Sequence, residues 1–254
     1  MDGRRNGPGE PAPGDDADWE RIPEELALAA RGVAPDSVPE RLCEACVRLL
    51  PATGASISMK SQKGIRVTLC ASDRVSAHLA EVQDTLGDGP CIEAGTLVAP
   101  VFAPDLTASA DARRWPLFVP QALEAGAEAV FSFPLALAGT AVGSLDLYRQ
   151  RAGPLGERDV RTALYIADAL TLSVLALPDR HPTREDGGVP WLTGAEANRE
   201  EIYQATGMLM VQLGVSAAEA LSRLRGRAFS QGRTITQVAK DVVERVGDGF
   251  DGDD

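Results

Sequence analysis

The chain has 254 residues, 44% of them hydrophobic and 24% charged, and a formal net charge of −12 at pH 7. This composition is ordinary for a soluble globular protein, and the length allows more than one core, since single domains usually span roughly 100–200 residues. No segment approaches the ~18 consecutive apolar residues of a membrane helix. Residues 1–20 lack the apolar centre of a signal peptide, so we expect a cytoplasmic protein.

The cysteines and the charges narrow the possible functions further. Four cysteines are too few and too irregularly spaced for a disulfide framework, and the C-x-x-C pair Cys43 and Cys46 has no second pair or histidines nearby. That pair lies in an apolar-periodic stretch, which favours small buried helix residues over a metal site, and we expect no metal and no cofactor. Residues 199–245 carry seven bases and five acids, in contrast to the acidic remainder. Such a positive cluster is what phosphate contacts require.

The first half of the chain alternates helix and strand patterns. Residues 1–20 are rich in Gly, Pro and Asp with little to bury, so we expect a disordered arm. Apolar residues spaced by three and four predict helices over Glu24–Arg31 and Val38–Leu50. Alternation of apolar and polar residues around a Gln-Lys-Gly turn predicts a hairpin of Gly54–Lys60 and Ile65–Ala71.

The same signals continue to residue 178. The elements they predict are, in order, helices over His78–Leu86 and Cys91–Ala94, a short strand within Val98–Phe102, a helix over Leu117–Ala125, strands Ala129–Leu137 and Thr140–Tyr148, and a long helix over Leu155–Leu177. Hairpins with helices between and around them indicate an α+β domain over residues 22–178, and not an alternating βαβ fold.

The C-terminal part is expected to be helical. Pro, Gly and charged residues over 179–194 indicate a linker. A helix is predicted over Ala195–Leu213. Capping boxes are predicted at Ser216–Glu219 and Thr234–Gln237, and each marks the start of a further helix. Three short helices with one shared core predict a compact bundle over residues 195–247, followed by an acidic tail over 248–254.

Segments of the sequence resemble two known families. Asn198–Met210 (NREEIYQATGMLM), Glu219-Ala-Leu, Leu224-Arg225 and Val238-Ala239 resemble the ANTAR family in residues and spacing. The upstream segment resembles a GAF domain in Leu86-Gly-Asp-Gly-Pro-Cys91, Arg114-Trp115-Pro116, Ala129–Pro134 and Gly143–Tyr148. The resemblances imply a GAF-like antiparallel sheet flanked by helices, linked to a C-terminal three-helix ANTAR bundle. They imply further that the bundle binds RNA in transcription antitermination, by stabilising paired hairpins of a leader transcript.

Site residues are expected in both parts of the chain, and the resemblance to the ANTAR family supports Arg225 among them. In the bundle, Arg225, Arg227 and Arg233 are candidate RNA contacts, and so are Gln204 and Thr206 on the first helix. Many ANTAR sequences carry Ala-Lys-Gly where this chain has Ala205-Thr206-Gly207, so one phosphate-binding lysine is missing. In the GAF-like part, the candidates for lining a ligand pocket are Phe102, Trp115, Phe118, Phe131 and Phe133.

The function expected is a signal-responsive, RNA-binding regulator, not an enzyme, because no Ser-His-Asp or Cys-His arrangement, Walker loop or dinucleotide motif can be placed. We expect a homodimer whose GAF domain senses a small molecule or a protein, with no membrane partner. Two alternatives remain: a DNA-binding helix-turn-helix regulator, and a ligand sensor whose bundle only dimerises. The apolar stripe that starts at Ile235 favours RNA over DNA, because a DNA recognition helix offers polar and basic residues at its N-terminal end.

Overall fold

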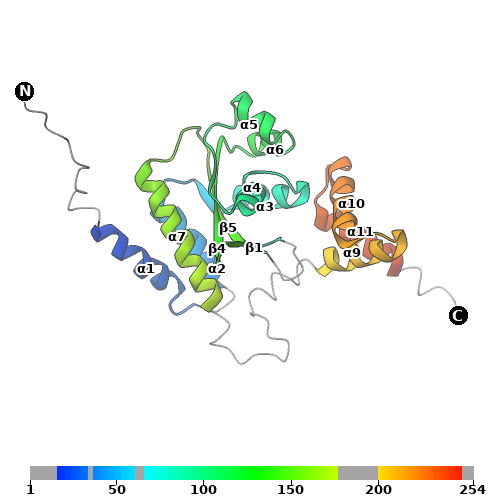
Figure 1. Cartoon of the computed structure of the whole chain (residues 1–254), viewed down its shortest axis with the longest axis horizontal. Helices are drawn as coiled ribbons and strands as arrows, with labels where there is room; N and C mark the ends of the chain where they lie inside the picture. Colours follow the sequence, from blue (N-terminus) through cyan, green and yellow to red (C-terminus); the bar gives the residue numbers. More distant parts are fainter. Residues whose placement is uncertain (1–15, 34–36, 61–65, 177–199, 248–254) are drawn as a thin grey trace, which may run out of the picture.

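The computed structural model describes residues 16–33, 37–60, 66–176 and 200–247 (Figure 1). Residues 1–15 of the expected arm, the linker over 179–194 and the acidic tail over 248–254 lie outside the described residues. The described elements are, in chain order, α1 (Asp16–Ala30), α2 (Val38–Leu49), β1 (Gly54–Lys60), β2 (Arg66–Ala71), α3 (Arg74–Leu86), α4 (Pro90–Leu97), β3 (Val101–Ala103), α5 (Ser109–Arg114), α6 (Phe118–Glu124), β4 (Ala129–Leu137), β5 (Thr140–Arg149), α7 (Glu157–Ala176), α9 (Glu200–Leu213), α10 (Ala217–Ser230) and α11 (Ile235–Gly247).

The five strands form one antiparallel sheet in the order β2-β1-β5-β4-β3, which confirms the expected α+β class. The hairpin of β4 and β5 turns through Ala138 and Gly139, whose φ angles of 49° and 78° are both positive. A two-residue turn with two positive φ values matches the twist of the flanking strands. The central pair, β1 and β5, aligns Ser56 with Asp146 and Ser58 with Ser144.

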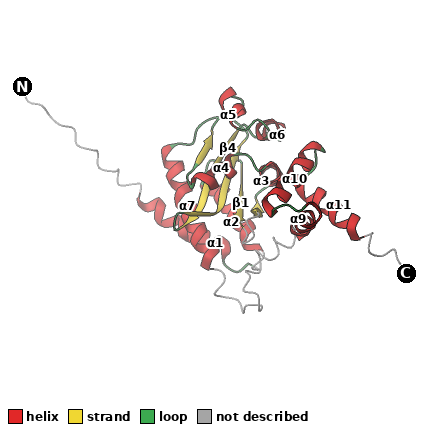
Figure 2. Ribbon diagram, turned by 45° about the vertical axis from the view of Figure 1, so that its right-hand side comes forward, coloured by secondary structure: helices red, strands yellow, loops and turns green. Residues whose placement is uncertain are grey.

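Helices cover both faces of the sheet (Figures 1 and 2). On one face α1, α2 and α7 bury a core with the inward residues of the strands, among them Ile57, Phe131 and Leu145. On the other face α3, α4 and α6 bury a second core, to which β4 and β5 contribute Val130 and Tyr148. Because side chains alternate along a strand, successive residues of β4 enter opposite cores.

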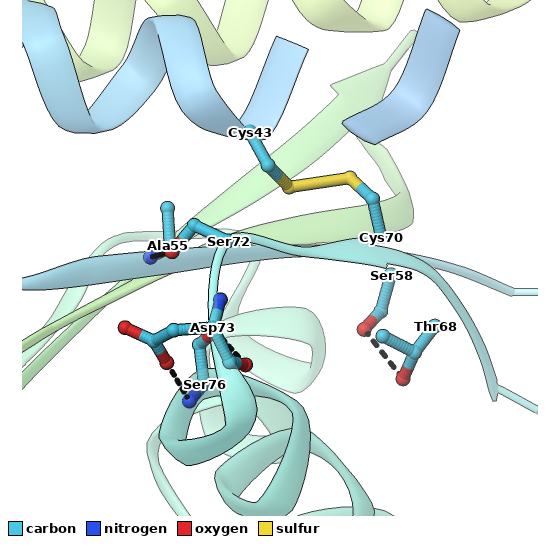
Figure 3. Close-up of a disulfide and its surroundings, with 8 residues drawn as sticks. All are labelled: Cys43, Ala55, Ser58, Thr68, Cys70, Ser72, Asp73 and Ser76. Carbon is cyan, nitrogen blue, oxygen red and sulfur yellow. Dashed lines mark hydrogen bonds between the residues drawn. A yellow bond between two sulfur atoms is a disulfide. The ribbon is translucent and has the colours of Figure 1, made fainter. Parts of the chain in front are cut away.

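A disulfide joins the first of these cores to the sheet. Cys43 on α2 and Cys70 on β2 are bonded, with their Cα atoms 6.5 Å apart (Figure 3). The expectation that Cys43 is only a small buried helix residue was therefore incomplete. Its partner lies 27 residues away on a different element, and only the packing of α2 on the sheet brings the two together. Cys46 is buried as a free thiol, as the helix pattern predicted.

The three C-terminal helices pack around one small core of Ile202, Ala205, Leu224, Ala228, Ile235, Val238 and Ala239. Both capping boxes proposed from the sequence form contacts. The Ser216 hydroxyl accepts from the Glu219 N–H at 3.3 Å. Thr234 and Gln237 bond each other's backbone N–H, at 3.1 and 3.2 Å. These helices lie beside α3, away from α1 and α7 (Figure 2).

Some elements differ from expectation. Helix α1 begins at Asp16, before the expected Glu24, so residues 16–20 of the expected disordered arm are helical. Helix α5 was not predicted. Helix α3 begins at Arg74, four residues before His78, because Asp73 and Ser76 form a capping box with bonds of 2.7 and 3.1 Å (Figure 3). The sequence signal was missed because Ser76 takes the place of the usual Glu or Gln.

Candidate functional site

The clustered arginines of the C-terminal bundle lie in different environments. Arg223 is exposed on α10, where it pairs with Glu219 at 2.6 Å. Arg227 is exposed as well. Arg233, in the connection to α11, makes two contacts with the Asp241 carboxylate, at 2.6 and 3.1 Å. These hydrogen bonds raise the pKa of the Arg233 guanidinium further above the physiological range.

Arg225 contacts the N-terminal domain. Its Nε donates to the backbone carbonyl of Asp84 at 3.0 Å, and its Nη2 lies 3.8 Å from Oδ1 of the same residue. Asp84 belongs to the last turn of α3, where carbonyls lack partners within the helix and the helix dipole attracts cations. Gly87 follows that turn with φ of +65°, and a Cβ there would lie 3.0 Å from the Arg225 guanidinium. The glycine therefore allows both the helix end and the close approach of Arg225.

Thr85, the residue after Asp84 in α3, adds a second contact between α3 and the bundle. The Thr85 hydroxyl accepts from the backbone N–H of Ile235 at 3.3 Å. Ile235 is the first residue of α11, and the first N–H groups of a helix have no acceptor within it. The C-terminal end of α3 thus binds a side chain of α10 and caps the start of α11. We refer to these four residues, Asp84, Thr85, Arg225 and Ile235, as the joint.

The joint is open on one side. A hollow of about 500 Å³ separates α3 and α6 from α10 and α11. Glu81 and Glu124 line its N-terminal wall, and Phe229 and Arg233 line its C-terminal wall. The phenyl ring of Phe229 is about half exposed. A contact of a few polar bonds beside a hollow is of the kind that allows domains to move relative to each other.

The sheet carries a buried ion pair next to the joint. Arg66 on β2 donates from Nη2 to the Ser144 hydroxyl at 2.6 Å and lies 3.7 Å from Asp146 Oδ2. The Ser144 hydroxyl in turn donates to Asp146 at 2.7 Å. Burial raises the pKa of the Asp146 carboxyl, and the positive charge of Arg66 opposes that rise. Burial lowers the pKa of the Arg66 guanidinium, and nearby negative charges, those of Asp146 and Asp84 among them, outweigh it, so that the pKa is raised.

The remaining bundle candidates differ in accessibility. Gln204 is exposed on α9. Thr206 is buried, and its hydroxyl donates to the Ile202 carbonyl at 2.6 Å. The Thr206 hydroxyl is therefore engaged within the bundle, and Gln204 is the first-helix candidate whose side chain is at the surface.

The five aromatic candidates do not line one pocket, which corrects the expectation. Phe131 and Phe133 lie in the core between the sheet and α7, whereas Trp115 and Phe118 lie in the core on the opposite face. Phe102 is at the sheet edge, with its ring 5.9 and 5.5 Å from those of Phe131 and Phe133. Successive strand positions point to opposite faces, so aromatic content alone did not show which rings share a space.

The sequence motifs shared with GAF domains have structural roles. In the Leu86–Cys91 motif, Gly89 has φ of +128°, and the Gln83 side chain accepts from the Cys91 N–H at 2.8 Å. Burial raises the pKa of the Cys91 thiol well above its usual range, which disfavours the reactive thiolate form. Arg114 and Trp115 both donate to the Glu93 carboxylate of α4. These contacts hold α4 against α3 and against the end of α5, and α3 carries the joint.

Sequence reasoning missed Asp84 and Thr85. An acid and a hydroxyl residue near a helix end resemble solvated surface positions, and no local pattern shows that residues 141 and 150 positions away contact them. The candidate Arg225 was identified from the family pattern, but its contact with the N-terminal domain was not.

Comparisons with known proteins agree with this organisation. The GAF domain model matches residues 33–174 and the ANTAR domain model matches residues 192–243. No curated protein matches the chain. Within the part of the chain that the structure describes, no helix has the length and apolar character needed to cross a bilayer.

Three solved structures are similar to part of this chain. The GAF domain of a phosphoenolpyruvate-protein phosphotransferase from Acinetobacter is 11% identical, covers 68% of this chain and 99% of its own, and has a TM-score of 0.50. The domain of a putative two-component sensor histidine kinase from Sinorhizobium meliloti is 21% identical, covering 58% and 95%, with a TM-score of 0.47. A free methionine-R-sulfoxide reductase from Thermoplasma acidophilum is 15% identical, covering 60% and 96%, with a TM-score of 0.44. Because the GAF model spans more than half of the 254 residues and the ANTAR model spans the C-terminal bundle, the chain belongs to the GAF domain family and carries an ANTAR domain at its C-terminal end.

Proposed function

We propose that the protein is an RNA-binding regulator of transcription antitermination whose RNA contacts are controlled by its GAF domain. The observation that carries the proposal is the joint, where Arg225, the bundle's central candidate for phosphate contact, is bonded to Asp84 of the GAF domain. A guanidinium held by a carboxylate and a carbonyl cannot bind RNA phosphate with the same donors. In the docked state the Arg225 side chain is 27% exposed and faces the GAF domain, which keeps an RNA hairpin from reaching its remaining donors. Docked and RNA-bound states of the bundle therefore exclude each other.

This exclusion gives the two domains a means of communication. A signal that binds the docked and the released states unequally shifts the equilibrium between them, and by linkage it changes the affinity for RNA. The exposed Arg227, together with Arg233 and Gln204, extends the proposed RNA surface beyond Arg225. RNA hairpins recognised by shape draw on backbone contacts from such basic and polar side chains. In this proposal the protein acts as a homodimer in the cytoplasm and catalyses no reaction.

The test is the binding of the full chain to a leader RNA with two hairpins, measured by fluorescence anisotropy at several salt concentrations. Arg225→Ala removes a proposed RNA contact and also loosens docking, so the diagnostic quantity is the salt dependence: the magnitude of the slope of log affinity against log salt should fall by about 0.7–0.9, the contribution of one phosphate contact. Arg223→Ala, a matched loss of charge at an exposed position on the same helix, should change the slope less, because Arg223 is not among the proposed RNA contacts.

The outcome decides between this function and its alternatives. Affinity for hairpin RNA no greater than for an unstructured RNA of equal charge would contradict the proposal. Preference for duplex DNA in competition would favour a helix-turn-helix regulator. Dimerisation that depends on residues 195–245, without affinity for either nucleic acid, would favour a sensor with a dimerising bundle.

A further inference from the structure

A second hollow lies on the other side of the joint, between the sheet, α4 and α10. Its volume is about 280 Å³, and its lining comes from both domains. Lys60 at the end of β1 and Arg66 at the start of β2 contribute from the sheet, and Arg225 contributes from the bundle. We refer to it as the cationic hollow, because these three side chains are its charged lining residues.

Positive charge exceeds negative charge around the cationic hollow. Three cations line it, and two buried acids, Asp84 and Asp146, pair with two of them, which leaves a surplus of one positive charge. This surplus occurs in a chain whose formal net charge is −12. Partly desolvated cations in a concave surface attract small anions more strongly than the same charges on an open surface.

The Arg66 guanidinium is suited to bind such an anion. Its side chain is 14% exposed, so a ligand that reaches it is largely shielded from water. Among the residues that the structure describes, the contacts of this guanidinium use Nη2. A guanidinium has five N–H donors in a planar fork, so donors on Nε and Nη1 remain to bind an oxyanion.

The remaining lining leaves space for a small ligand. Gly95 and Thr96 of α4 border the hollow, and a Cβ placed on Gly95 would have no atom within 4 Å. Gly87 at the end of α3 also borders it. A volume of 280 Å³ lies just below the ~300–1,000 Å³ of sites for drug-sized ligands, and is large enough for a phosphate or pyrophosphate group with a short organic part.

We propose that the cationic hollow binds a small phosphate-bearing anion that joins Lys60 and Arg66 of the GAF domain to Arg225 of the bundle. The consequence for regulation rests on the proposed function. Because the anion contacts both domains, it binds the docked state more tightly than the released state. Raising its concentration therefore lowers the affinity for RNA, and RNA lowers the affinity for the anion by the same factor.

The direct test is isothermal titration of the full chain with pyrophosphate and, in a separate arm, with inorganic phosphate, at constant ionic strength. We expect saturable binding of one pyrophosphate per chain, weakened at least tenfold in Lys60→Ala and in Arg225→Ala. The matched control is Lys240→Ala, which removes an exposed lysine paired with Glu244 on α11 and should bind as the unaltered chain does. Lys60 is exposed, so its replacement does not endanger the fold.

Several results would overturn the inference: no saturable binding, equal binding by Lys60→Ala and the unaltered chain, or equal loss in Lys240→Ala. Succinate binding as tightly as pyrophosphate would reject the assignment to phosphate. The titration with pyrophosphate contains no RNA, so the anion site and the proposed RNA-binding function are tested independently. Hairpin binding without pyrophosphate binding would overturn this inference alone, and pyrophosphate binding without hairpin binding would overturn the proposed function alone.

Discussion

Replacing Asp84 by asparagine should increase the affinity for hairpin RNA. The substitution keeps the shape of a side chain that is 4% exposed and removes its charge, while the backbone carbonyl that accepts from Arg225 Nε remains. At 3.8 Å and an effective dielectric constant of about 20, the attraction between the two charges is roughly 4 kcal/mol before desolvation is subtracted. Hydrogen bonds to charged groups contribute about 1.5–3 kcal/mol net. Because one of the two contacts survives, we expect the docked state to lose about 1–2 kcal/mol.

A shift of that size changes the ratio of docked to released bundles by roughly 5- to 30-fold. If the docked state predominates in the unaltered chain, the apparent affinity for RNA rises by the same factor, since only the released fraction binds. Fluorescence anisotropy with the two-hairpin RNA measures the change directly.

Asp168→Asn is the matched control. It removes the same charge from an exposed position on α7, on the opposite face of the sheet, and so reports the general effect of a less negative protein. Equal affinities of Asp84→Asn and Asp168→Asn, in a chain that binds hairpin RNA, would refute the reasoning that docking at Asp84 restrains Arg225.

Three further predictions concern stability. Reducing the disulfide between Cys43 and Cys70 should lower the free energy of unfolding by about 2–4 kcal/mol, which would appear as a lower denaturation midpoint in urea. An unchanged midpoint would contradict this prediction, and so would the titration of four free thiols in the unfolded chain before reduction. Burial raises the pKa of Asp146, so its contribution to stability is present at low pH and is lost as pH rises through that pKa. The unfolding free energy of the unaltered chain relative to Asp146→Asn should therefore fall from pH 4 to pH 7, and a constant or rising difference would refute the assignment. Gly207→Ala should raise the thermal midpoint by an amount equivalent to about 1 kcal/mol, because a Cβ in this part of α9 meets no atom within 4 Å; a lower midpoint by circular dichroism would show a hidden clash.

Local signals in the sequence were sufficient for much of the fold. The bounds of β1 and β4 agree with the predicted strands, and β5 ends one residue later than predicted. Helix starts were predicted where a standard cap was present, as at Thr234, and misplaced where it was not, as at Arg74. These features depend on residues within a few positions of each other, so a linear pattern contains them.

Contacts between residues far apart in the sequence could not be predicted from these local patterns. The pairing of Cys43 with Cys70 requires α2 to pack on β2, and the separation of Phe131 from Trp115 depends on which face of the sheet each ring enters. Neither is determined by spacing along the chain, because many packings satisfy the same periodicity.

The contact between the two domains likewise has a part that the sequence predicted and a part that it did not. Linear patterns were enough to assign an arginine cluster to a C-terminal helical bundle and to place Arg225 after a core leucine within it. The contact of this arginine with the last turn of α3, beside Arg66 and Lys60, depends on the packing of the folded chain. Free carbonyls at a helix end attract a cation wherever one can reach them, and which cation reaches them depends on how the two domains pack.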